Sequence, residues 1–175
     1  MKSTVIIYSS TDGQTKRICE RLVGQIGDET NVDLFSIQDS AKINLEMYEK
    51  IVIGASIRYG KHSPLVYDFV EKNKHEFLNK FTAFFTVNVV ARKPQKNTPE
   101  TNPYIKKFLE LSQWKPTLLG VFAGKIDYPQ YKFLDRFMIR LIMYITGGPT
   151  DVSETFEFTN WGAVDHFGRT ILSAK

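Results

Sequence analysis

The sequence predicts one α/β domain built on a five-stranded, doubly wound parallel sheet. Three observations support this fold class. The predicted strands are short, continuous apolar runs, segments with helical spacing of apolar residues alternate with them, and the length of 175 residues suits one domain. Continuous apolar strands indicate a sheet that is covered on both faces, and alternation with helices indicates parallel order.

Five segments are predicted to form the strands of this sheet. Most are rich in β-branched or aromatic residues and are followed by polar or glycine-containing turns, whereas the second alternates between apolar and polar residues. The strands are expected at Thr4–Tyr8, Asn31–Ile37, Lys50–Ala55, Phe81–Val87 and Thr117–Ala123.

Four helices are predicted to connect or follow these strands. The first has apolar residues at positions 18, 22, 23 and 26, which share one helical face. The second begins at a proline, which suits the first helical turn because its missing N–H would be unpaired there anyway. The helices are expected at Gln14–Ile26, from Pro64 onward, at Tyr104–Leu111 and at Trp161–Leu172.

The stretch between the fifth strand and the last helix is too long for a simple connection. We expect a single domain over residues 1–175 with an insertion at about 125–155. Within it, a helix that ends at Gly147 would gather Lys132, Asp135, Arg136 and Arg140 on one side. Its other side would be apolar, with Phe133, Leu134, Phe137, Met138, Leu141, Ile142, Tyr144 and Ile145. Such a helix either docks on the core or contacts a membrane or an apolar substrate.

Composition narrows the class of partner and the compartment. The 23 Lys and Arg residues exceed the 19 Asp and Glu residues, and the net charge of +4 fits an anionic ligand, nucleic acid or membrane surface. The single cysteine, Cys19, excludes an internal disulfide and a cysteine-based zinc cluster. No apolar run reaches the roughly 18 residues of a spanning helix, and the N-terminal run is too short for a signal peptide, so a cytoplasmic location is expected.

The loop after the first strand carries the clearest chemical signal. Residues 9–15 read Ser-Ser-Thr-Asp-Gly-Gln-Thr and lead into the first helix. Hydroxyl groups, backbone N–H groups and a helix N-terminus converge there, which is what a phosphate group requires. The loop lacks the patterns that bind ATP or dinucleotides. The alternative is an ordinary Ser/Thr/Asp helix cap.

Residues 6–15, together with Leu22, resemble the phosphate-binding signature of the flavodoxin family. The resemblance implies a flavodoxin-like fold and FMN as the cofactor. Two residues depart from the family pattern: Cys19 replaces a usual alanine in a buried position, and Asp12 brings a negative charge beside the phosphate. Asp12 is therefore expected to point away or to cap the helix. The cofactor-binding residues implied here are Ser9, Ser10, Thr11, Gly13, Gln14 and Thr15.

Two further loops follow strands and fit a flavin ring. The first supplies an aromatic ring and the cation of Arg58, which would favour an anionic reduced flavin and two-electron chemistry. Judged without the loop at residues 9–15, the segment that contains Arg58 and Tyr59 would be explained equally well as a surface turn. The second matches the loop that wraps the isoalloxazine ring in flavodoxins. The residues expected to bind the flavin are Ser56, Ile57, Arg58, Tyr59 and Gly60, followed by Asn88, Val89, Val90 and Ala91.

Most of the chain is similar to the menaquinone-dependent protoporphyrinogen IX dehydrogenases, a flavodoxin-like family of bacterial haem biosynthesis. The similar stretches are residues 12–15, 52–60, 87–94, 112–114 and 135–143. The resemblance implies an oxidoreductase that removes six electrons from protoporphyrinogen IX through FMN and passes them to menaquinone or another membrane quinone. It also implies peripheral association with the inner face of the cell membrane.

The implied substrate is a large apolar macrocycle with two propionates, so cations are expected near the flavin. Because the flavin carries the oxidation, no side chain is expected as a catalytic acid or base. His62, His75 and His166 are scattered without metal-ligand spacing, so no metal site is expected, and His62 is interpreted as a loop residue. The residues expected to contact substrate or membrane are Arg92, Lys93, Lys125, Arg136 and Arg140.

Three other functions were weighed against this one. A flavodoxin-type electron carrier is usually acidic so that it can dock on basic partners, and the net charge of +4 argues against it. An FMN-dependent quinone reductase is the second alternative. The sequence has no second nucleotide-binding motif for NAD(P)H, although such enzymes often lack one. Nucleic-acid binding is disfavoured because the basic residues are dispersed and the aromatic residues lie on apolar faces.

Overall fold

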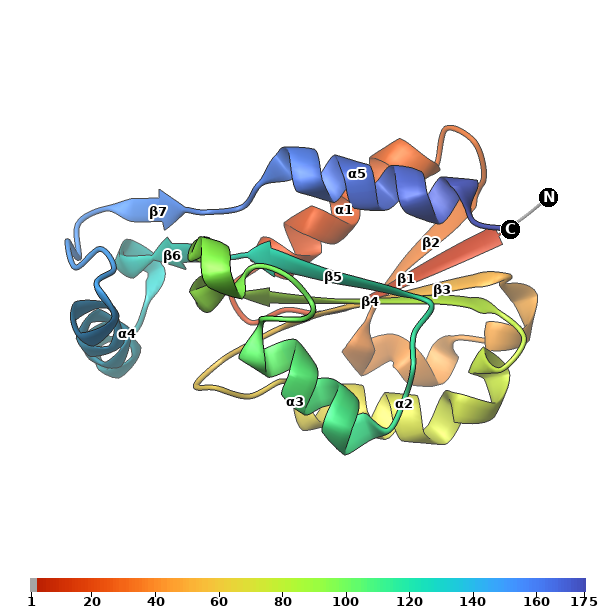
Figure 1. Ribbon diagram of the computed structural model, residues 1–175, viewed down its shortest axis with the longest axis horizontal. Coiled ribbons are helices and arrows are strands. Elements are labelled where there is room, and N and C mark those ends of the chain that lie inside the picture. The colour runs from red at the N-terminus through yellow and green to blue at the C-terminus, as the bar shows by residue number, and fades with distance from the viewer. Residues whose placement is uncertain (1–2) are drawn as a thin grey trace.

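A computed structural model describes residues 3–175 and shows the predicted five-stranded parallel sheet (Figure 1). The strand order is β2-β1-β3-β4-β5, and every neighbouring pair is parallel. The strands are β1 (Ser3–Ser9), β2 (Asn31–Ser36), β3 (Lys50–Ser56), β4 (Phe81–Asn88) and β5 (Leu118–Ala123). The second strand ends one residue before the predicted bound because Ile37 begins a 3-10 turn, whose first N–H groups are capped by Ser36.

Helices cover both faces of the sheet, as Figure 1 shows. The helices α1 (Gln14–Ile26) and α5 (Trp161–Ser173) lie on one face, and α2 (Pro64–Phe77) and α3 (Pro103–Ser112) lie on the other. Each face has its own apolar core, with Phe85, Phe122 and Phe167 in one and Phe84 and Phe108 in the other. Short 3-10 turns, Ile37–Lys42 and Leu45–Met47, connect β2 to β3.

The central strands are apolar because they are buried on both sides. All of β3 except its last residue is buried, and Gly54 lies within it against the ring of Phe85. A Cβ at Gly54 would lie 2.2 Å from Phe85 Cζ, so only glycine leaves room for this ring. Packing on both faces of the sheet therefore restricts β3 mainly to apolar and small residues.

The predicted insertion forms a separate lobe at one end of the sheet (Figure 1, left). It contains β6 (Lys125–Asp127), the 3-10 turn Tyr128–Gln130, α4 (Phe133–Thr146) and β7 (Thr155–Glu157). β6 and β7 form a two-stranded antiparallel sheet. A small apolar core of Ile126, Tyr128, Tyr131 and Met143 holds the lobe together.

The orientation of α4 differs from that of a helix docked by its apolar side. Met143 is its one buried residue, and Ile139 packs against the same small core. Arg136 also faces the lobe, where its guanidinium donates hydrogen bonds to the backbone oxygens of Tyr128 and Tyr131. The outer side is apolar and exposed, and consists of Phe133, Leu134, Phe137, Met138, Leu141, Tyr144 and Ile145.

The C-terminal end of α4 is fixed by backbone and side-chain contacts. Gly147 adopts a φ of +72°, and Gly148 N donates to Met143 O at 2.7 Å, which confirms the predicted helix end. Arg92 donates from Nη2 to Thr146 O at 3.2 Å, so a cation lies at the negative end of the helix dipole. Within residues 3–175, no helix is both long and apolar enough to cross a membrane.

Candidate functional site

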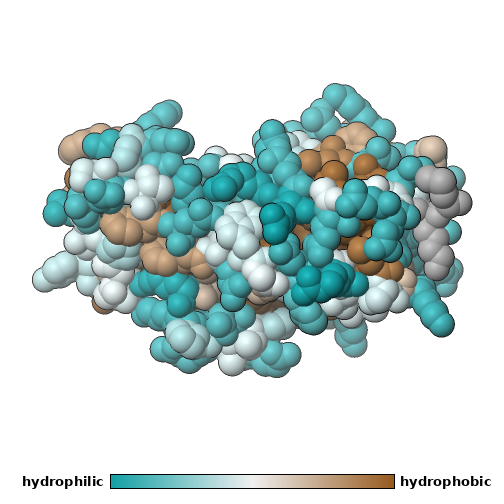
Figure 2. Space-filling view, turned by 90° about the horizontal axis from the view of Figure 1, so that it is seen from above, coloured by the Kyte–Doolittle hydropathy of each residue, from teal (hydrophilic) through white to brown (hydrophobic). Residues whose placement is uncertain are grey.

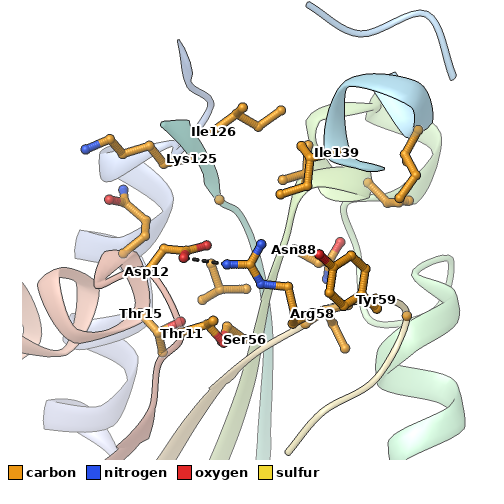
Figure 3. Close-up of a pocket in the computed structure, with 18 of the residues that line it drawn as sticks. Thr11, Asp12, Thr15, Ser56, Arg58, Tyr59, Asn88, Lys125, Ile126 and Ile139 are labelled. Atoms are coloured by element: carbon orange, nitrogen blue, oxygen red, sulfur yellow. Dashed lines mark hydrogen bonds and ion pairs between the residues drawn. The ribbon is translucent and has the colours of Figure 1, made fainter. Parts of the chain in front are cut away.

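One cleft opens at the carboxyl ends of β1, β3 and β4, where the three predicted loops meet the insertion (Figure 3). Strands of a parallel sheet end at a common edge, which is where ligands bind in open α/β folds. The predicted site residues that line the cleft are Ser10, Thr11, Gln14, Thr15, Ser56, Ile57, Arg58, Tyr59, Gly60, Asn88, Val89, Val90 and Lys125.

The remaining predicted residues lie behind or outside the cleft wall. Ser9 ends β1, and its carbonyl accepts a hydrogen bond from Ser56 Oγ at 3.3 Å. Gly13 shapes the first loop, and Ala91 is buried beneath the third. The cations Arg92, Lys93, Arg136 and Arg140 are absent from the wall, and two of them, Arg92 and Arg136, bind backbone carbonyls of the insertion.

The first loop presents the uncapped N-terminus of α1 to the cleft. Gly13 has a φ of +95°, a conformation that favours glycine, and its N–H donates to Ser10 Oγ at 3.0 Å. No side chain caps the first turn of α1. Thr15 Oγ1 is buried and has no hydrogen-bond partner in the protein. An orphaned hydroxyl beside free helix N–H groups fits a phosphate group.

The side chain of Gln14 binds partners outside the first loop. Its Nε2 donates to Glu157 Oε1 at 3.0 Å and to Thr159 Oγ1 at 2.9 Å. Thr159 in turn donates to the backbone oxygen of Ala123. Gln14 therefore joins the first loop to β7 and to the segment that follows it.

The second loop is a tight hairpin turn at residues 58–61. Arg58 N donates to Lys61 O at 3.0 Å, and Lys61 N donates to Arg58 O at 3.2 Å. The two residues between them, Tyr59 and Gly60, have positive φ values of 49° and 75°. Two-residue turns of this kind require positive φ at both positions, which is unfavourable for tyrosine. Gly60 of this strained turn lines both the cleft and a second cavity that reaches α2.

Arg58 extends across the cleft to Asp12 in the first loop (Figure 3). Burial raises the pKa of Asp12, and the neighbouring Arg58 acts in the opposite direction. Asp12 was expected to point away or to cap α1, but it lines the cleft and binds Arg58 instead. Tyr59 also donates a hydrogen bond to Asp135 of α4. Polar contacts thus join the second loop to both the first loop and the insertion.

A buried amide pair fixes the third loop. Asn88 Oδ1 accepts from Ala91 N at 3.0 Å and from Asn102 Nδ2 at 3.1 Å, while Asn88 Nδ2 donates to Thr86 Oγ1 at 3.3 Å. Asn88, Asn102 and Thr86 are all buried. The 3-10 turn Val89–Arg92 is therefore held at the cleft by side chains from β4 and from the start of α3.

His62 is a buried residue rather than an ordinary loop histidine. It is 4% exposed, and its ring contacts the rings of Phe84 and Phe108 edge-on. Its Nε2 lies 2.9 Å from Thr86 Oγ1. Burial lowers its pKa from 6.5 to about 4, so His62 is neutral at pH 7.

Sequence reasoning missed the wall that the insertion and α3 contribute to the cleft. These segments are far from the three loops in sequence, and the one local signal was the apolar character of residues 139–143. The described residues contain no group of three or more His, Cys, Asp or Glu side chains that could hold a metal ion. The cleft residues missed are Asp12, Val87, Tyr104, Gly124, Ile126, Tyr131, Ile139, Ile142 and Met143.

The buried, neutral His62 predicts a loss of stability in acid. Between pH 6.5 and 4 the unfolded chain binds a proton at this residue that the folded protein does not, so stability is lost as the pH falls. From pH 7 to pH 4.5 the free energy of unfolding should fall by about 2 kcal/mol through this group. Urea unfolding of His62→Gln should lack this part of the pH dependence. An equal pH dependence in His62→Gln and the unchanged protein would contradict the assignment, and His75→Gln, at an exposed position, is the control.

Comparisons with known proteins agree with this geometry. A family model described as a flavodoxin domain matches residues 5–153. Among solved structures, oxidised flavodoxin 1 from Bacillus cereus matches with a TM-score of 0.58 and 16% identity, covering 99% of both chains. Flavodoxin 2 from the same organism has a TM-score of 0.53 and 16% identity, with 97% of both chains covered. At these identities the structures establish the fold.

Curated relatives are much closer in sequence. A protein named protoporphyrinogen IX dehydrogenase [quinone] from Leishmania major is 46% identical over 165 residues, which cover 93% of this chain and 71% of the relative. The Escherichia coli K12 protein of the same name is 41% identical over 169 residues, covering 96% of this chain and 93% of the relative. The chain therefore carries a flavodoxin domain and belongs to the family of quinone-dependent protoporphyrinogen IX dehydrogenases.

Proposed function

We propose that this protein oxidises protoporphyrinogen IX to protoporphyrin IX in haem biosynthesis and passes the electrons to a quinone. The observation that carries the proposal is identity of 41–46% to dehydrogenases of this name over 93–96% of the chain. Coverage this high includes the insertion as well as the flavodoxin core. Full oxidation removes six electrons and six protons from the macrocycle, so three quinones become quinols for each porphyrin formed.

The proposed cofactor is FMN, bound through its phosphate at the first loop. The uncapped α1, the positive φ of Gly13 and the orphaned hydroxyl of Thr15 support this assignment. When bound, FMN supplies the two-electron oxidation, so the protein provides binding, orientation and electrostatics. Arg58, at the mouth of the cleft, is proposed to exchange Asp12 for the flavin ring and to favour its anionic reduced form.

The insertion is proposed to hold the macrocycle against the flavin. Ile139, Ile142 and Met143 of α4 line the cleft and supply an apolar wall. Lys125 lies on the same wall and pairs with Asp127 at 3.3 Å, so it is a candidate partner for a propionate. Arg140 is exposed on α4, outside the wall. Arg92 and Arg136, which bind carbonyls of the insertion, are proposed to position α4 rather than to meet the substrate directly.

We further propose that α4 places the protein on the inner face of the cell membrane, where menaquinone or another lipid-soluble quinone is available. Phe133, Leu134 and Ile145 are 80%, 74% and 73% exposed, and they belong to the side of α4 that faces away from the cleft. Figure 2 shows apolar side chains among polar ones at the end of the molecule that carries the insertion (left). The neighbouring cations Lys132 and Arg140, with the net charge of +4, suit an anionic lipid surface.

The phosphate assignment predicts a selective effect of Thr15→Val. Loss of the hydroxyl should weaken FMN binding about tenfold, because one hydrogen bond to a charged group is worth about 1.5 kcal/mol. The fold should remain intact, since Thr15 Oγ1 has no protein partner to lose. Thr30→Val is the matched control, because it removes another buried hydroxyl without a partner that lies outside the cleft. Titration of apoprotein with FMN measures both, and equal affinities in the two variants would refute the assignment.

The activity itself is tested under anaerobic conditions with protoporphyrinogen IX and menadione. Purified protein containing FMN should generate fluorescent porphyrin faster than the protein-free mixture, with three menadiones reduced for each porphyrin. An electron carrier would not catalyse this reaction. Porphyrin formation at the rate of the protein-free mixture would overturn the proposed function.

The membrane assignment predicts that Leu134→Glu weakens binding to anionic liposomes at least tenfold. The change removes an apolar group worth roughly 1.5–3 kcal/mol of burial and adds a repelled charge. Leu78→Glu is the matched control, because Leu78 is 80% exposed at the C-terminal end of α2. Liposome flotation measures the difference while FMN absorbance confirms an intact site. Equal flotation of the two variants would count against α4 as the membrane contact.

A further inference from the structure

A second cavity adjoins the cleft on the other side of the 58–61 turn. Its volume is about 280 Å³, and it lies between this turn, α2 and α3. Ile57, Gly60 and Tyr104 line both the cavity and the cleft. These three residues therefore lie between the two spaces.

His62 can give this cavity a hydrogen-bond donor. Thr86 Oγ1 lies 2.9 Å from His62 Nε2 and can donate its hydroxyl hydrogen to that nitrogen while it accepts from Asn88 Nδ2. A neutral His62 that accepts at Nε2 carries its proton on Nδ1. Nδ1 has no hydrogen-bond partner among residues 3–175, and the side chain lines the cavity. The arrangement leaves this nearly buried N–H to a ligand.

The rest of the lining suits a neutral aromatic ring rather than an anion. Pro64, Tyr67 and Leu111 supply apolar and aromatic surface. The charges at the cavity are mixed, since Asp68 accompanies Lys61 and Lys107. A propionate or a phosphate would meet both signs, whereas a quinone carries two uncharged acceptor oxygens on an apolar ring.

We propose that this second cavity binds the quinone ring, with His62 Nδ1–H donating to one of its carbonyl oxygens. The inference rests on the proposed function and adds a separate place for the electron acceptor. A quinone held there would become a quinol by taking up the two electrons and two protons that each oxidation step removes from the macrocycle, so both of its carbonyls would become hydroxyls. Ile57, Gly60 and Tyr104 would separate this quinone from a macrocycle on the α4 side.

The test separates the two half-reactions in an anaerobic stopped-flow experiment on the FMN-loaded protein. Leu111→Trp narrows the cavity at a position that is 60% exposed, and His62→Phe removes the donor. After reduction of the flavin, both variants should be reoxidised by menadione at least tenfold more slowly than the unchanged protein. Reoxidation by dioxygen, which is small enough to bypass the cavity, should remain within twofold.

Matched controls lie on α2, outside the cavity. Leu65→Trp, on α2, and His75→Phe, at an exposed position, should be reoxidised by menadione at the unchanged rate. Saturation-transfer NMR on oxidised FMN-loaded protein adds a readout besides activity, because menadione signals should weaken in the presence of Leu65→Trp but not of Leu111→Trp. Leu111→Trp keeps the test valid if His62→Phe does not fold, because the Leu111 side chain is largely in solvent.

The two proposals fail in different ways. If protoporphyrinogen IX does not reduce the flavin of the unchanged protein, the proposed function is wrong. If it does, and menadione reoxidises Leu111→Trp as fast as Leu65→Trp, the quinone site is wrong while the function stands. Competition between menadione and protoporphyrinogen IX for one site would also overturn the separate cavity.

Discussion

The parallel pairing of β1, β3 and β4 is the constraint on which the site depends. Ser9 lies opposite Ala55, and Ser56 lies opposite Val87, so the three strands end at nearly the same level. Ile57 N donates to Val87 O just beyond the paired strands, which fixes the start of the second loop as well. The three loops therefore begin at the same edge of the sheet, and the cleft lies between them.

The insertion is attached to all three loops by polar contacts. The first loop reaches the segment around β7 through Gln14 and Glu157, and the second reaches α4 through Tyr59 and Asp135. The third loop holds the end of α4 through Arg92. Because these contacts occupy the polar side of the lobe, the apolar side of α4 is left facing outward. An exposed apolar surface of this kind is unfavourable in water unless a partner covers it, which is the physical basis for the proposed membrane contact.

The fold and the conformation of the first loop could be predicted from the sequence because both depend on local patterns. Strand and helix periodicity, and the turn at Gly13, need no knowledge of distant residues. The partners of charged and polar side chains were beyond such reasoning. Arg92 and Arg136 were expected to contact substrate or membrane, yet both bind backbone carbonyls that only the folded insertion brings near. No motif around His62 predicts its burial, because that burial depends on Phe84 of β4 and Phe108 of α3.

The two cavities suggest why the turn at Tyr59 and Gly60 is short and strained. A tyrosine at positive φ costs roughly 1 kcal/mol relative to an ordinary conformation, and strain of this size persists near functional sites when the surroundings impose it. A two-residue turn is the shortest hairpin connection, so the chain occupies little width between the cleft and the second cavity. Gly60 adds no side chain to either space, and a Cβ there would meet no atom within 4 Å. A longer loop would relieve the strain but would place more chain between the cleft and the second cavity. The strain at Tyr59 is therefore consistent with a requirement for a short chain segment between the cleft and the second cavity.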